Sequence, residues 1–177
     1  MRPTEVLKEE HRAIERALKA LEVAAERLDL GQEVPGELLE KILEFVRGFA
    51  DRCHHHKEES VLFPYLERKG LPRDLGPIGV MLAEHEMGRG HVKAMAEAVE
   101  EARPRDFVAH ARAYAALLRD HIAKEDNVLF PMADQMIGPV EAEELMGEFE
   151  EAEEELKVSH ERYLAILEEL ESSLGID

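Results

Sequence analysis

The stretch HHHKEESVLFP at residues 54–64 recurs as HIAKEDNVLFP at residues 121–131. The two copies are identical at seven registered positions, which carry a His, a Lys, a Glu and the run Val-Leu-Phe-Pro. In each copy the Glu follows the first His by four residues, which places both side chains on one face of an α-helix, about 6 Å apart along its axis. A lone His-x-x-x-Glu pair, such as His11 and Glu15, is expected by chance, but a registered repeat is not. The repeat therefore indicates metal-ligand chemistry at two places in one fold.

Composition restricts the classes of function. The chain has 177 residues, enough for one domain with its own core, and a formal net charge of −18 disfavours binding to nucleic acid or to an anionic membrane. The one cysteine, Cys53, cannot form an internal disulfide. We find no signal-like apolar start, no run near the about 20 apolar residues of a membrane helix, and no Gly-rich phosphate loop. We therefore expect a soluble, cytoplasmic protein.

Apolar residues recur at helical spacing along the chain, which predicts an all-α fold. Four helices are expected: Thr4 to about Leu30, about Pro35 to Arg68, one opening at Pro77, and one starting between Pro104 and Asp106. Thr4 is expected to cap the first helix and Gly31 to end it. Because the connectors are short, neighbouring helices should be antiparallel. Residues 1–137 are thus predicted to form an up-down-up-down four-helix bundle.

An additional C-terminal helix is expected over about Glu141 to Leu174, within an extension that covers residues 138–177. Its first half is rich in Glu, which is typical of a solvated face. Its second half carries a stripe at helical spacing: Leu156, His160, Tyr163, Leu167, Leu170 and Leu174. That stripe should cover either the bundle or a second subunit, in which case the protein would be a homodimer through this helix.

Six ionisable residues fall on the inward stripes of the four bundle helices: His11, His54, Glu58, His85, His121 and Glu125. Buried carboxylates are costly unless they are paired or bind metal. Four imidazoles and two carboxylates could hold two ions, with two His on each ion and the Glu residues bridging. This mixed nitrogen and oxygen set suits iron or manganese, whereas a single structural zinc usually has Cys among its four ligands.

The ordered pattern resembles the hemerythrin-like (HHE cation-binding) domain family. The resemblance covers about residues 5–135 and rests on His11, the two repeat copies with their Leu-Phe-Pro tails, and Glu84-His85-Glu86. It implies a non-haem di-iron centre with two irons per chain, in which the four inward His are terminal ligands and the two Glu are bridges. Arg89 departs from the family, because oxygen-carrying hemerythrins place a ligand His at this position. We therefore expect a more symmetric centre with open positions on both ions, as in the iron-sulfur-repair relatives.

Several other residues have alternative interpretations. His55 and His56 are rotated by about 100° and 200° from His54 on an α-helix, so we expect surface or supporting roles for them. Cys53 is expected to be a small core residue and not a thiol redox centre. Tyr114 is expected to pack in the core, with hydrogen bonding to a metal ligand as the alternative. His160 should form a hydrogen bond in a helix interface, or approach the position left by Arg89.

These features lead us to expect a di-iron protein that binds O₂, NO or a related small oxidant such as peroxide, as a sensor, a carrier or a stress protein. No reductase or output domain is evident in the sequence, which favours binding over catalysis. The alternatives are an enzyme that turns over NO or peroxide or serves iron-sulfur cluster repair, and a structural, metal-dependent interaction module.

Overall fold

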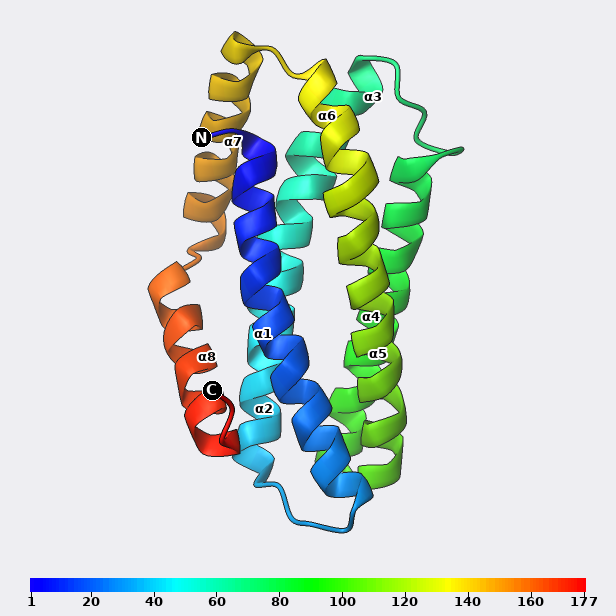
Figure 1. Cartoon of the computed structure of the whole chain (residues 1–177), viewed down its shortest axis with the longest axis vertical. Helices are drawn as coiled ribbons and strands as arrows, with labels where there is room; N and C mark the ends of the chain where they lie inside the picture. The colour runs from blue at the N-terminus through cyan, green and yellow to red at the C-terminus, as the bar shows by residue number, and fades with distance from the viewer.

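Four antiparallel helical runs form a bundle in the computed structural model, which describes residues 1–177 (Figure 1). The first run is α1 (Pro3–Asp29) and the third is α4 (Pro77–Glu100). The second run comprises α2 (Gly36–Phe45), η1 (Val46–His55), η2 (Glu58–Leu62) and α3 (Phe63–Arg68), and the fourth comprises α5 (Pro104–Lys124), η3 (Glu125–Leu129) and α6 (Phe130–Met136). The predicted all-α, up-down-up-down bundle is confirmed. None of its helices combines the length and the apolar character needed to cross a membrane.

The start of α1 differs from the prediction. Thr4 does not cap the helix but lies within it, and its hydroxyl donates a hydrogen bond of 2.5 Å to Asp134. The helix begins one residue earlier because Pro3 fits its first turn, where no backbone N–H is needed. At the other end, Gly31 has a φ of 77°, a conformation that favours glycine, and ends the helix as predicted.

The segments labelled η are π-helical turns, and both copies of the repeat contain one. The backbone N–H of Phe63 donates to the carbonyl of Glu58, and that of Phe130 donates to the carbonyl of Glu125, in both cases five residues back. The next residue of each copy is a proline, which has no N–H and so removes one bond of the regular helix. The repeat is therefore a structural unit as well as a pattern of candidate metal ligands.

Two helices follow the bundle, where one was predicted. α7 (Pro139–Leu156) and α8 (His160–Leu174) are separated at Lys157, which adopts a left-handed conformation with a φ of 54°. Ser159 then caps α8 by accepting a hydrogen bond from the backbone N–H of Arg162. Both helices run along one side of the bundle (Figure 1). Leu167, Leu170 and Leu174 belong to the bundle's apolar core, so the stripe covers the chain's own bundle.

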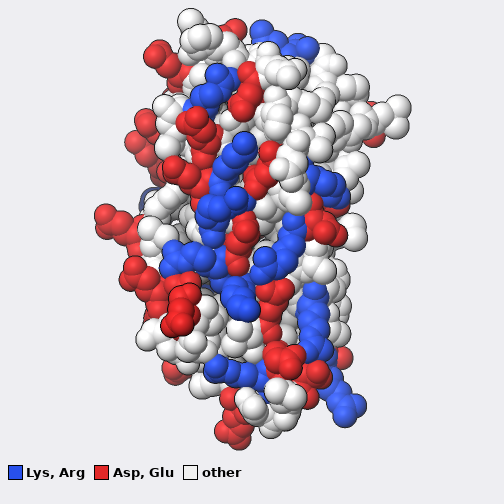
Figure 2. All heavy atoms as spheres, in the orientation of Figure 1, with Lys and Arg blue, Asp and Glu red and all other residues white.

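The apolar core consists of two clusters with a polar layer between them. One cluster surrounds Ile14, Leu18 and Phe45, and the other surrounds Leu7, Phe63 and Phe130. On each bundle run, the buried His and Glu residues lie where the residues of one cluster give way to those of the other, and on the fourth run His121 directly precedes Ile122 of the first cluster. Figure 2 shows the outer surface of one face, where acidic and basic side chains are interleaved. The unusual feature of the molecule is therefore its layer of buried His and Glu residues, and not its surface charge.

Candidate metal centre

The polar layer gathers all six residues predicted as ligands and adds His55. Seven side chains are involved, none more than 3% exposed: His11 from α1; His54 and His55 from η1; Glu58 from η2; His85 from α4; His121 from α5; and Glu125 from η3. Every run of the bundle contributes at least one of them. A layer of this kind exists only when the four runs are packed together.

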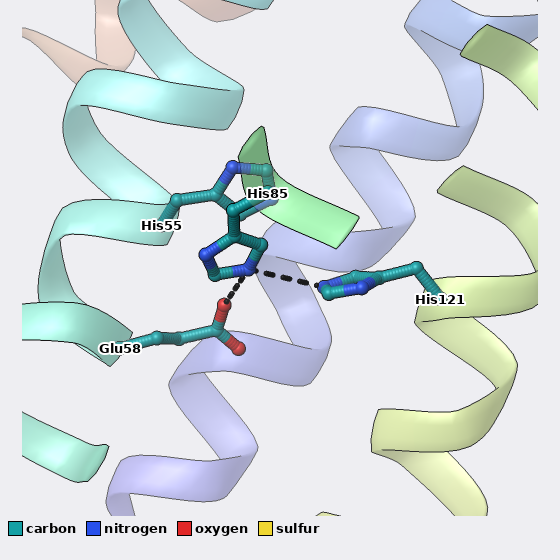
Figure 3. A group of neighbouring side chains, drawn as sticks. All are labelled: His55, Glu58, His85 and His121. Carbon is teal, nitrogen blue, oxygen red and sulfur yellow. Dashed lines mark hydrogen bonds and ion pairs between the residues drawn. The ribbon is translucent and has the colours of Figure 1, made fainter. Parts of the chain in front are cut away.

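The seven residues form two groups, in each of which four ligand atoms lie within 4.8 Å of one another. The first group contains His11, His54, Glu58 and Glu125. The second group contains His55, Glu58, His85 and His121, and is drawn in Figure 3. Both groups are completely buried, and Glu58 belongs to both.

The two carboxylates lie between the groups. Glu58 places Oε1 3.2 Å from His85 Nε2 and Oε2 3.7 Å from His54 Nε2. Glu125 Oε1 lies 3.1 Å from His11 Nε2 and 3.3 Å from His121 Nε2. Each carboxylate therefore contacts an imidazole on either side, which is the placement that two bridging ligands require.

The position of His55 corrects the sequence interpretation. An α-helix would turn His55 about 100° away from His54, but η1 is π-helical, so each residue advances through a smaller angle. His55 is 3% exposed, and its ring stacks on His85 with 3.8 Å between centroids. A surface position is therefore wrong for His55. The groups hold two and three imidazoles, in contrast to the symmetric two and two that we expected.

Each of the five imidazoles forms a hydrogen bond from Nδ1 to a carboxylate. The pairs are His11 with Asp126 at 2.7 Å, His54 with Glu10 at 2.9 Å, His55 with Asp51 at 3.3 Å, His85 with Glu59 at 2.6 Å, and His121 with Glu84 at 2.9 Å. An ionised carboxylate only accepts hydrogen bonds, so Nδ1 carries the proton. Nε2 is then left with its lone pair facing the interior, which is how histidines are oriented for metal binding.

These outer carboxylates are paired in turn with cations. Lys57 pairs with Glu10, Lys124 with Glu84, and Arg12 with Asp126. Arg89 contacts Asp51 at 2.8 Å and Glu59 at 2.7 Å. Arg89 thus supports the two carboxylates that orient His55 and His85.

The chemistry of the donor set tests whether a metal fits. The buried atoms that lack any hydrogen bond include His54 Nε2, His55 Nε2, both oxygens of Glu58 and Oε2 of Glu125. In addition, Nε2 of His85 and Nε2 of His121 are 3.2 Å apart, so both nitrogens lie within reach of one ion. Metal–nitrogen bonds of about 2.1 Å would accommodate this separation, so the residues fit a metal centre.

Electrostatics favour the metal-binding form for some of these groups. Burial lowers the pKa of His54 to about 4 and that of His55 well below its usual range, so both imidazoles are neutral at neutral pH. Burial also opposes the charged form of His121, but Glu125 and Glu84 outweigh it and raise the pKa to about 9. Burial and then the charge of Glu125 raise the pKa of Glu58. Two carboxylates this close cannot both be ionised without a compensating cation.

Other repeated residues support the layer in matching ways. Phe63 stacks on His85, with centroids 6.1 Å apart, and Phe130 stacks on His11, with centroids 5.4 Å apart. Lys57 and Lys124 each pair with the carboxylate that orients the histidine of their own copy. The Val position is not equivalent, because Val61 is buried while Val128 is 51% exposed.

A further cluster joins the bundle to α7 and α8. Glu10, Cys53, Glu153 and His160 lie together, and the ammonium of Lys57 contacts both carboxylates and provides their cation. His160 is within hydrogen-bond distance of Glu153, at 2.7 Å, and joins neither metal-binding group; the interface alternative for His160 is thus confirmed. Burial raises the pKa of Cys53 to about 12, which keeps the thiol protonated and fits a core residue.

Tyr114 is 2% exposed, as expected for core packing. No hydrogen bond joins its hydroxyl to a His or Glu of the two groups.

A four-helix bundle that encloses two buried His/Glu groups defines a class of metal-binding bundle proteins. The hemerythrin HHE cation binding domain matches residues 2–133 of the chain. The chain therefore belongs to the hemerythrin HHE cation-binding domain family. The match covers the bundle and all seven residues of the polar layer, while α7 and α8 lie outside it.

Two kinds of relatives are similar to the chain. An uncharacterized protein of Mycobacterium tuberculosis is 28% identical over 181 residues, which cover 97% of this chain and 70% of that protein. A protein of Mycobacterium bovis matches to the same extent. The iron-sulfur cluster repair protein YtfE of Yersinia pseudotuberculosis is 31% identical over 88 residues, which cover 45% of this chain and 40% of YtfE.

Proposed function

We propose that this protein holds two iron ions in the polar layer and binds a small oxidant, O₂, NO or peroxide, as a sensor, a carrier or a stress protein. The observation that carries the proposal is the pair of buried His/Glu groups that share Glu58 and leave several inward atoms without hydrogen bonds, among them both oxygens of Glu58 and Nε2 of His54 and His55. Mixed imidazole and carboxylate ligands suit iron. Two such ions would supply open coordination positions for a small molecule.

The two groups differ in how many protein ligands they offer. The second group has three imidazoles and the first has two, and both carboxylates reach each group. An octahedral ion would therefore have more free positions in the first group. We infer that a small oxidant binds at the first group, which contains His11 and His54, because fewer protein ligands would occupy an ion there.

The experiment is anaerobic reduction of the iron-loaded protein, followed by addition of O₂ or NO under absorption spectroscopy. The proposal predicts a charge-transfer band that appears on addition and is lost reversibly when the gas is removed. A protein that takes up no iron, or whose spectrum ignores both gases, would contradict the proposal.

Iron-sulfur cluster repair is a second candidate, favoured by the partial similarity to YtfE. The same samples separate the two functions. A repair protein should restore activity to a damaged iron-sulfur enzyme in a mixed assay, and a sensor or carrier should leave that enzyme unchanged. Irreversible consumption of NO or peroxide would indicate an enzyme of another kind.

A further inference from the structure

A cavity of about 200 Å³ opens beside the second group, between η1, α4 and α5. His55 and His85, both buried, are part of its lining, and the exposed side chains of Arg47 and Lys93 are also part of it. The cavity therefore connects the molecular surface to two imidazoles of the metal-binding layer. Its volume exceeds what a diatomic gas needs, since one water requires only about 10–15 Å³ on a comparable measure.

The walls of the cavity combine apolar and cationic side chains. Val46, Val92 and the ring of Tyr114 give it an apolar surface. Three cations, Arg47, Arg89 and Lys93, line it together with a single carboxylate, Asp51. A ligand in this cavity would thus meet apolar walls and an excess of positive charge.

The three cations of the cavity differ in whether a carboxylate of the chain neutralises their charge. Arg89 contacts Asp51, Glu59 and Glu86, so its charge is satisfied within the chain. Arg47 and Lys93 take part in no ion pair or hydrogen bond of their side chains. Two unpaired cations at one opening stand out in a chain whose formal net charge is −18. A cleft lined by one sign of charge concentrates ligands of the opposite sign.

We propose that this cavity binds a small polyatomic monoanion, a short carboxylate or an oxyanion of nitrite type, next to His55 and His85. Arg47 and Lys93 select the charge, and the apolar walls limit the size. That the anion thereby approaches a metal ion rests on the proposed function, whereas binding of the anion in the cavity does not.

The test uses formate and formamide, which are nearly equal in size but differ in charge, with calorimetric titration of the protein as purified. Formate should bind more tightly than formamide, and its affinity should fall as salt is added. In the double variant Arg47→Gln/Lys93→Gln the affinity for formate should fall about tenfold, about threefold for each charge at a water-exposed position. Binding of formamide should not change.

The matched control is Lys19→Gln/Arg105→Gln, which removes the same two charge types from exposed positions that do not line the cavity. This variant should bind formate within about twofold of the parent protein, because the removed charges lie outside the cavity. Equal losses in both double variants, or no preference for formate over formamide, would overturn the proposal. Metal content measured on the same samples separates the outcomes: absence of iron contradicts the di-iron function, and the formate titration still decides on the cavity.

Discussion

His54 and His55 are adjacent in sequence, yet both face the polar layer. The reason is that η1 is π-helical, so each of its residues advances through a smaller angle than in an α-helix. His55 is held there by Asp51, which Arg89 supports. Arg89 has a role in the site although it cannot bind a metal.

Replacing His55 by Ala should weaken metal binding in the second group, because one of its three imidazoles is lost. We expect His55→Ala to release about half of the bound iron on dialysis, while the first group keeps its ion. The matched control is His56→Ala, which changes the next residue, whose ring contacts only Ser60 among polar side chains. Equal iron contents of the two variants, measured by elemental analysis, would show that His55 is not a ligand.

The two repeat lysines provide a second test, because they have the same role at different depths. Lys57 is 1% exposed and contacts Glu10 and Glu153, whereas Lys124 is 44% exposed and contacts Glu84. Lys57→Met should reduce the free energy of unfolding by about 3 kcal/mol, since it removes the buried cation that Glu10 and the partly buried Glu153 share. Lys124→Met should cost less than about 1 kcal/mol. Chemical denaturation measures both losses of stability, and similar losses would contradict the difference in burial between the two lysines.

The ligand residues that could be predicted from sequence are those on regular inward stripes. His11, His54, His85 and His121 follow the helical period, and Glu58 and Glu125 repeat within an identical motif. His55 could not be predicted to face inward in the same way, because the sequence does not indicate where a π-helical turn replaces the α-helical period. The run of three histidines at residues 54–56 was the available signal, and the assumption of 100° per residue obscured it.

At the scale of helices, the four bundle runs were predictable because apolar periodicity, proline starts and glycine stops agree with one another. The break between α7 and α8 was missed because a non-glycine residue, Lys157, takes the left-handed conformation there. Ser159, a good N-cap residue, was the remaining signal for the start of α8. The capping residue of α1 was missed because Thr4 and Pro3 are adjacent and both suit a helix start.

The helices α7 and α8 are connected to the metal layer through a polar chain. His160 contacts Glu153, Glu153 contacts Lys57, Lys57 contacts Glu10, and Glu10 accepts a hydrogen bond from His54. The extension that lies outside the family match therefore reaches the back of a predicted ligand. It packs against the site without providing a ligand to it.

We expect His160→Ala to leave the iron content unchanged, because His160 belongs to neither metal-binding group. The free energy of unfolding should fall by about 1 kcal/mol, the usual contribution of one hydrogen bond, since the His160 side chain is 41% exposed. Glu161→Ala, at the next and exposed position, serves as the control for α8. Loss of iron in His160→Ala alone would make His160 a ligand and contradict this arrangement.

At the scale of the whole molecule, a buried polar layer separates two apolar clusters, so we expect metal binding to be coupled to folding. Without metal, two carboxylates and five imidazoles are buried, and both carboxylates and two of the imidazoles have inward atoms that lack hydrogen-bond partners. The metal-free protein should therefore melt well below the iron-loaded protein at neutral pH. Calorimetry of the two forms measures the difference, and equal melting temperatures would contradict a metal site in the core.

The stability of the metal-free protein should depend on pH, because the pKa values of His54 and His121 are shifted in opposite directions. The pKa of His54 is about 4 in the folded protein and about 6.5 in an unfolded chain, so stability falls as pH drops from about 6.5 to about 4, by about 3 kcal/mol. The raised pKa of His121, about 9, contributes stability below about pH 6.5 that is lost as pH rises through 9. Maximum stability near pH 6.5 is expected in a pH series of melting curves, and a steady rise in stability toward pH 9 would contradict these shifts.

Iron loading followed by elemental analysis and Mössbauer spectroscopy tests the central claim most directly. The two His/Glu groups share Glu58 and both contact Glu125, so the oxidised protein should hold two ferric ions per chain that are magnetically coupled through shared ligands. Glu58→Ala should weaken the coupling, because it removes one of the two carboxylates that contact both groups and leaves Glu125 as the other. One ion per chain, or two ferric ions without magnetic coupling in the unchanged protein, would contradict the account.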